Sequence, residues 1–253
     1  MIIELKSVKF AYGRDRFAID DVSIQFPVSG LSAIIGRNGS GKSTLLKLAA
    51  GLIRPQSGRV LYEDKDIETI SAYTLADYRS FVPQNLYVRS DVTVKQFVSF
   101  GLYKNMDFFS RLRKDDSERV NYYMDTLEII KVSKHRIWEI SGGELQKAHI
   151  ARALVQNAKV LLMDEPVSNI DLDYKFRIMS VLKSIAKEKC VILVAHDVNS
   201  ALNYADEIIA LKEGKMESTG SPEFTANALN GIYERRFLIE KVRGKYIILD
   251  EED

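Results

Sequence analysis

Residues 34–44, IIGRNGSGKST, join an apolar strand end to a glycine-rich loop, and residues 45–50, LLKLAA, continue in a helical pattern. A G-x-x-x-x-G-K-S loop between a strand and a helix is typical of a phosphate-binding loop. Its glycines let the backbone wrap closely around a phosphate chain, and the following helix adds its positive end. The sequence therefore predicts a nucleoside triphosphate site made by Gly36, Arg37, Asn38, Gly39, Ser40, Gly41, Lys42, Ser43 and Thr44.

Within this loop, Lys42 and Ser43 have separate expected roles. Lys42 is expected to contact the β- and γ-phosphates, and the Ser43 hydroxyl to ligate Mg²⁺. A second apolar stretch, residues 160–163, ends at Asp164 and Glu165. An aspartate at the end of a strand can hold Mg²⁺, and the next carboxylate can polarise an attacking water. Asp-Glu after a strand is common by itself, so the upstream phosphate loop is what favours these roles.

Strand and helix patterns alternate along most of the chain, which predicts an α/β fold with a mostly parallel sheet covered on both faces. Continuous apolar runs at 31–35, 160–164 and 190–195 are typical of central parallel strands. Residues 2–10 and 19–26 predict further strands, and residues 22–26 alternate as an antiparallel strand does. The N-terminal part is therefore expected to form an antiparallel β subdomain on a P-loop NTPase core.

A helical block interrupts the alternation. Helices are predicted at 93–104, about 115–130, 141–154 and 174–188, and the first three fall in one block. We therefore expect a single domain over residues 1–253, with a nucleotide-binding core at 1–84 and 158–220, an inserted α-helical subdomain at 85–157 and a C-terminal tail at 221–253.

Composition limits the class of protein. The formal net charge of +1 provides no overall electrostatic argument for nucleic acid as a partner. The single cysteine, Cys190, lies in an apolar strand and fits a reducing cytoplasm. Residues 1–6 are too short and too charged for a signal peptide, and no run of about 18 apolar residues predicts a membrane span. A link to a membrane is therefore expected to go through a partner.

A second glycine loop, residues 140–144 (ISGGE), precedes a predicted helix with Ser141 as its N-cap. Backbone donors and a helix N-terminus make it another anion site. With this loop in place, the sequence resembles the ATP-binding subunit of an ABC transporter, with ISGGE at the position of that family's LSGGQ signature. The resemblance covers nearly the whole chain, with seven motifs in the family's order.

The resemblance implies roles for four further residues. Tyr12 matches the aromatic residue that stacks on adenine, and Gln84 matches the glutamine that contacts Mg²⁺ and senses the membrane partner. His196 matches the switch histidine at the γ-phosphate. Asp171 lies in residues 168–171 (SNID), which match the loop that crosses to the other subunit. Without this context, a single Gln or His is more often a surface or structural residue.

The resemblance also implies a head-to-tail homodimer. In that arrangement Ser141, Gly142 and Gly143 face the γ-phosphate held by Lys42 of the other copy. Ile140, Glu144 and Val167 depart from the usual Leu, Gln and Thr, but none of these changes removes a phosphate donor or the base. An active Mg²⁺-dependent ATPase is therefore expected.

Two softer resemblances concern transport. Residues 92–98 with 101–103, and the tail, are similar to importers of iron chelates, haem and cobalamin. They imply an integral-membrane permease and an extracellular substrate-binding protein as partners, with this chain on the cytoplasmic face of the membrane. Gln84 and residues 99–110 are candidates for the permease groove, with Tyr103, Phe108 and Phe109 as its aromatics. The alternative is a soluble ABC ATPase scaffold, such as an iron–sulfur cluster assembly subunit.

Overall fold

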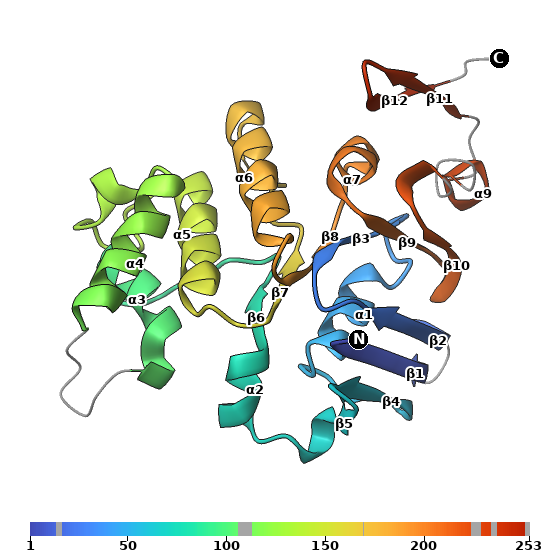
Figure 1. Cartoon of the computed structure of the whole chain (residues 1–253), viewed down its shortest axis with the longest axis horizontal. Helices are drawn as coiled ribbons and strands as arrows, with labels where there is room; N and C mark the ends of the chain where they lie inside the picture. The colour runs from blue at the N-terminus through green and yellow to red at the C-terminus, as the bar shows by residue number, and fades with distance from the viewer. Residues whose placement is uncertain (14–16, 106–112, 169, 224–228, 234–236, 251–253) are drawn as a thin grey trace.

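The protein is built around a six-stranded sheet, in a computed structural model that describes residues 1–13, 17–105, 113–168, 170–223, 229–233 and 237–250 (Figure 1). The strand order is β10-β9-β3-β8-β7-β6, and only the β9–β10 pair is antiparallel within this sheet. Its strands are β3 (Gly30–Gly36), β6 (Arg79–Val82), β7 (Val160–Asp164), β8 (Cys190–Val194), β9 (Glu207–Lys212) and β10 (Lys215–Gly220). The expected mostly parallel sheet is confirmed.

A smaller antiparallel sheet carries the N-terminus, with the order β2-β1-β4-β5. Its strands are β1 (Ile3–Phe10), β2 (Ile19–Phe26), β4 (Ser57–Tyr62) and β5 (Lys65–Asp66). Ile24 and Phe26 on β2 are buried while the residues between and beside them face solvent, as the alternating pattern predicted. The antiparallel N-terminal sheet is thus also confirmed.

Helices cover the central sheet and form a separate group beside it. Those that flank the sheet are α1 (Lys42–Ala49), α2 (Ala72–Tyr78), α6 (Leu172–Ile185) and α7 (Val198–Tyr204). The group at the left of Figure 1 consists of α3 (Val94–Ser99), α4 (Lys114–Thr126) and α5 (Gly142–Val155). Short 3₁₀ turns are η1 (Ile67–Thr69), η2 (Phe100–Asn105) and η3 (Ile130–Val132). The helical block therefore exists where the sequence predicted it.

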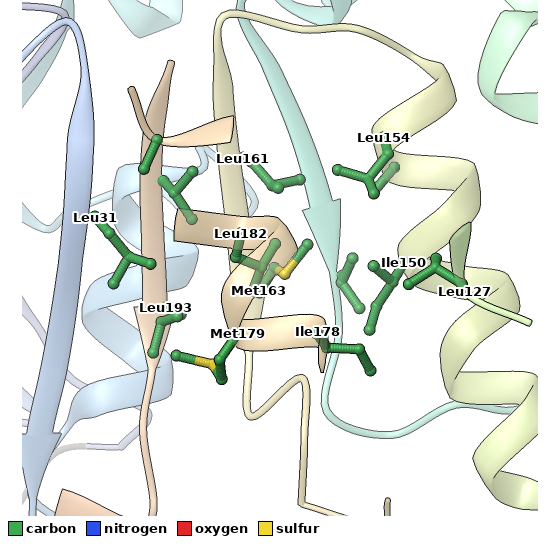
Figure 2. Close-up of a cluster of buried hydrophobic side chains, with 14 of the residues drawn as sticks. Leu31, Leu127, Ile150, Leu154, Leu161, Met163, Ile178, Met179, Leu182 and Leu193 are labelled. Atoms are coloured by element: carbon green, nitrogen blue, oxygen red, sulfur yellow. The ribbon is translucent and has the colours of Figure 1, made fainter. Parts of the chain in front are cut away.

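One apolar cluster joins the sheet to this helical group (Figure 2). It runs from Leu31 on β3 through Met163 on β7 and Met179 on α6 to Ile150 on α5 and Leu127 after α4. All five side chains are almost fully buried. Burial of one large aliphatic side chain contributes about 2 kcal/mol. The cluster therefore fixes α5, and with it the second glycine loop, relative to the strand ends.

Two helices of the block, α3 and α4, are shorter than predicted. The helix expected at 93–104 is α3, which stops at Ser99 and continues as the 3₁₀ turn η2. Gly101 in η2 lies against the α5 backbone, where an added Cβ would come within 2.3 Å of the Arg152 carbonyl oxygen. This close approach is a tertiary contact that local periodicity does not express. Helix α2 and strand β10 were not predicted.

The C-terminal segment lies against the core and ends in a hairpin. It comprises α9 (Leu229–Tyr233), β11 (Phe237–Val242) and β12 (Lys245–Asp250). β11 and β12 pair antiparallel over their full length, from Phe237↔Asp250 to Val242↔Lys245. In Figure 1 this hairpin lies at the upper right, beyond α7 and α9.

Candidate nucleotide-binding site

The phosphate loop connects β3 to α1, at the carboxyl edge of the central sheet. Gly41 occupies the N-cap of α1 with φ 101°, a left-handed conformation that favours glycine. A Cβ at Gly41 would lie 2.3 Å from the Ala18 carbonyl oxygen, and a Cβ at Gly36 would lie 2.3 Å from that of Leu211. Both glycines are therefore required by neighbouring backbone, and the loop is held closed between β2 and β9.

Lys42 is folded across this loop. Its ammonium group donates to the carbonyl oxygens of Gly36 at 2.8 Å and Arg37 at 2.9 Å. Burial lowers the pKa of Lys42, while the carboxylates of Glu165 and Asp164 act in the opposite direction. The loop thus holds a buried cation whose charge is balanced by two acids at the end of β7.

Asp164, the last residue of β7, meets Ser43 at the start of α1. The Ser43 hydroxyl donates to Asp164 Oδ1 at 2.9 Å. Burial raises the pKa of the Asp164 carboxyl, and the Ser43 hydrogen bond opposes that shift. A hydroxyl and a carboxylate are the hard oxygen donors that Mg²⁺ prefers. Among the described residues, no group of three or more acidic, histidine or cysteine side chains is placed to hold a metal ion by itself.

Glu165 follows in a strained backbone conformation, with φ 50°. Its carbonyl oxygen accepts hydrogen bonds from the Gln146 side chain at 3.3 Å and from the Ser168 hydroxyl at 3.1 Å. Non-glycine residues with positive φ are uncommon and gather at functional sites. These two hydrogen bonds hold the backbone of the turn after β7, from which the Glu165 side chain extends.

His196 follows β8 and faces the same cavity as Glu165. This cavity has a volume of about 390 Å³, and its lining includes Glu165, Ser168, Lys175, His196 and Asp197. His196 itself is exposed. The structure therefore brings together the predicted base and the predicted switch histidine, which are 31 positions apart in the sequence.

Asp197 and Lys175 form a support behind His196 that sequence reasoning missed. Asp197 is the N-cap of α7, accepts from the Asn199 N–H at 3.0 Å and the Ser200 hydroxyl at 2.8 Å, and pairs with Lys175. Burial would raise the pKa of Asp197, but the hydrogen bonds from Lys175 and Ser200 outweigh it and lower the pKa. The available signal was an aspartate directly before a helical stretch.

Tyr12 lies at the margin of the site, and Gln84 follows β6, the strand next to β7. The ring of Tyr12 is exposed and stands edge-on to Phe10, with 4.9 Å between centroids. The Thr44 hydroxyl donates to the Tyr12 hydroxyl at 3.4 Å, which places Tyr12 beside the phosphate loop. Gln84 is exposed, two residues after β6.

The second glycine loop is separate from the first. Ser141 caps α5 in a capping box, with its N–H and hydroxyl both donating to Glu144 Oε2 at 2.9 and 2.8 Å. Gly142 begins α5 and Gly143 follows it. Asp171 is the N-cap of α6. In Figure 1, α5 belongs to the helical group at the left, whereas α1 lies beside the central sheet.

The predicted permease-facing residues are only partly described. Tyr103 is 80% exposed on η2. Phe108 and Phe109 lie outside the described residues, as does Asn169 in the stretch before Asp171. None of the helices in the described part of the chain has the length and apolar character required to cross a bilayer.

Known proteins resemble the chain over most of its length. The family model described as ABC transporter matches residues 19–168. The petrobactin import ATP-binding protein FpuC of Bacillus anthracis is 33% identical over 88% of this chain and 82% of its own length. The ferric enterobactin transport ATP-binding protein FepC of Escherichia coli is 32% identical over 94% of this chain and 90% of its own length.

Solved structures of ATP-binding cassettes also resemble the chain. The dimeric structure of MJ0796, a bacterial ABC transporter cassette, superposes with a TM-score of 0.79 at 26% identity, covering 87% of this chain and 99% of that one. A second dimeric structure of MJ0796, bound to ADP and Pi after hydrolysis, gives a TM-score of 0.77. The phosphate loop, the acids after β7 and the second glycine loop are thus set in a known framework. The chain belongs to the ABC transporter family, as an ATP-binding cassette that hydrolyses ATP.

Proposed function

We propose that this chain powers the import of an iron chelate through a separate membrane permease. The observation that carries this proposal is the similarity, over 94% of the chain, to a ferric enterobactin transport ATP-binding protein, together with the petrobactin relative. A protein named for iron(3+)-hydroxamate import, from Bacillus subtilis, is 30% identical over 92% of this chain. The chain would then lie on the cytoplasmic face of the membrane, held there by the permease, with an extracellular substrate-binding protein as an indirect partner.

The residues of the phosphate loop bind the triphosphate in this proposal. Backbone N–H groups of residues 36–44 surround the β- and γ-phosphates, and Lys42 turns its ammonium from the loop carbonyls to the phosphate oxygens. Tyr12 stacks on the adenine ring. Ser43 and Asp164, together with Gln84, would hold Mg²⁺, which would supply positive charge to the β- and γ-phosphates.

Glu165 and His196 carry the hydrolytic step. Glu165 accepts a proton from the water that attacks the γ-phosphorus, while the bond to the β-phosphate oxygen breaks and ADP and phosphate form. His196 donates a hydrogen bond to the γ-phosphate from across the shared cavity. Gln146 and Ser168 hold the Glu165 backbone in place through its carbonyl oxygen.

A second copy of the chain completes the site. Phosphoryl transfer depends on positioning and charge stabilisation in a water-poor site, and a phosphate loop open to solvent provides neither. Ser141, Gly142 and Gly143 of a head-to-tail partner cover the γ-phosphate, and Asp171 lies in the loop that crosses between the copies. In the single chain, the Ser141 hydroxyl donates a hydrogen bond to Glu144, and this bond must break before Ser141 can contact the γ-phosphate.

Co-purification from the native cells tests the importer proposal. A tagged chain should bring down a polytopic membrane protein in detergent extracts, and soluble extracts should not yield a stoichiometric partner. In a strain lacking the chain, the wild type should restore uptake of a ferric chelate and Glu165→Gln should not. Soluble partners alone would contradict the proposal and favour the cluster-assembly scaffold.

A further inference from the structure

The outer edge of the C-terminal hairpin is hydrogen-bonded to two asparagines on α7. The Asn203 side chain donates to the Tyr246 carbonyl oxygen and accepts from the Tyr246 N–H, both at 2.9 Å. The Ile248 N–H donates to Asn199 Oδ1 at 3.1 Å. The Asn203 amide thus pairs both backbone groups of Tyr246, as an adjacent strand would.

The spacing on both elements makes this match possible. Asn199 and Asn203 are one helical turn apart and share a face of α7. Tyr246 and Ile248 are two residues apart on β12, so their side chains lie on the same face of the strand. Both pack against the apolar core. The second donor of the Asn203 amide bonds the Asn199 carbonyl oxygen at 2.8 Å, which fixes the orientation of that side chain.

α7 begins directly behind the hydrolytic site. It starts at Val198, and His196 and Asp197 immediately precede it. Its seven residues span about 10 Å, so Asn203 lies near the end of the helix that is farther from His196. Asp197 attaches the near end to Lys175 on α6. A displacement of α7 at Asn203 therefore moves His196.

The same C-terminal segment also contacts the phosphate loop. Leu229 and Ile232 of α9 are fully buried, and Lys212 donates to the Gly231 carbonyl oxygen at 2.8 Å. Burial raises the pKa of Tyr233, and a hydrogen bond from the Gly36 backbone opposes this shift. The segment therefore touches both the first glycine of the loop and the helix behind His196.

We propose that the C-terminal hairpin sets the position of α7 and thereby of His196, with Asn199 and Asn203 as positioning residues for ATP hydrolysis. This inference rests on the proposed contact of His196 with the γ-phosphate. An isolated two-stranded hairpin is only marginally stable, so its docking to α7 can be released by removing a few hydrogen bonds. Loss of docking slows hydrolysis and leaves ATP affinity nearly unchanged, because the contact with the phosphate loop is made by Tyr233 on α9 and not by the hairpin.

The test compares Asn203→Ala and the double variant Asn199→Ala/Asn203→Ala with the control Asn121→Ala, which changes an exposed asparagine on α4. Asn203→Ala should lower kcat by at least about fivefold, because it removes both hydrogen bonds to Tyr246 and each is worth about that factor, with KM for ATP changed less than about twofold. The double variant should show a larger decrease in kcat, and the control variant should keep the wild-type kcat.

A near-isosteric variant and an exchange measurement report on the contact itself. Asn203→Asp keeps the acceptor for the Tyr246 N–H but sets a carboxylate against the Tyr246 carbonyl oxygen, so it should also lower kcat. Amide hydrogen exchange at Tyr246 and Ile248 should quicken in all three variants and stay unchanged in Asn121→Ala.

Three results would overturn the inference. If His196→Ala hydrolyses ATP at the wild-type rate, the proposed role of His196 fails and the inference fails with it. If His196→Ala is inactive while the double variant matches Asn121→Ala despite faster exchange at Tyr246, only the hairpin inference fails. Equal losses of ATP affinity and kcat with a lowered Tm would show a general folding defect and would also contradict a positioning role.

Discussion

His149 should make the protein sensitive to mild acid. It lies within α5 with 5% of its surface exposed, its ring stands 4.8 Å from that of Phe97, and neither ring nitrogen has a hydrogen-bond partner among the described residues. Burial, aided by the charge of Arg152, lowers the pKa of His149 to about 4 from its usual 6.5. The folded state therefore holds a neutral imidazole at pH values where the unfolded chain binds a proton.

The sign and size of the effect follow from proton linkage. Between pH 6.5 and 4 the unfolded state binds more protons at this site, so stability falls as the pH falls and the loss levels off below pH 4. The two pKa values give a loss of about 2 kcal/mol between pH 8 and pH 5, and about 3 kcal/mol by pH 4.

Urea unfolding of the wild type and His149→Leu at pH 8 and pH 5 measures this contribution. The leucine variant fills the same apolar position without a titratable group, so the wild type should lose about 2 kcal/mol more than the variant over this range. The acids of the chain titrate in both proteins and cancel in the difference. Equal losses for the two proteins would refute the reasoning.

Three further substitutions have expected outcomes. Gly101→Ala sets a methyl group 2.3 Å from the Arg152 carbonyl oxygen, so it should destabilise the chain by about 2 kcal/mol in urea unfolding, and an unchanged midpoint would contradict that contact. Tyr62→Phe removes a buried hydrogen bond of 2.7 Å to the Ala49 carbonyl oxygen and should lower the free energy of unfolding by about 1 kcal/mol in urea. An unchanged free energy of unfolding would contradict a contribution from this hydrogen bond. Glu165→Gln should bind ATP with wild-type affinity but lose hydrolysis, and a wild-type phosphate release rate would remove Glu165 as the base.

Local patterns were enough to predict the loop and the strand end that form the candidate site. The phosphate loop needs its glycines, its lysine and its serine at fixed spacing, so its chemistry is visible in one short stretch of sequence. The apolar strand before Asp164 is equally local, because a strand buried on both faces needs a continuous apolar run. Mutual placement of the two stretches follows from the parallel sheet, which brings the ends of β3 and β7 to one edge.

Contacts between distant positions were not visible in this way. The α3 helix stops at Ser99, and Gly101 just beyond it lies against the α5 backbone, a contact that no feature of residues 93–104 alone reveals. The pairing of Asn203 with Tyr246 spans 43 positions, and asparagine in a helix more often indicates an exposed polar face. The salt bridge between Lys175 and Asp197 depends on the packing of α6 beside α7. Such contacts can be recognised only once the fold is known.

The shared nucleotide site is the central claim of the proposed mechanism, and a mixing experiment tests it most directly. Lys42→Ala removes the phosphate contact from one copy, and Ser141→Arg blocks the second glycine loop of the other, so each variant alone should be nearly inactive. A head-to-tail dimer that contains one copy of each still has one intact site, formed by Lys42 of one copy and Ser141 of its partner. The account predicts that ATP hydrolysis reappears when the two inactive variants are mixed. A mixture no more active than its separate components would contradict a site shared between two chains.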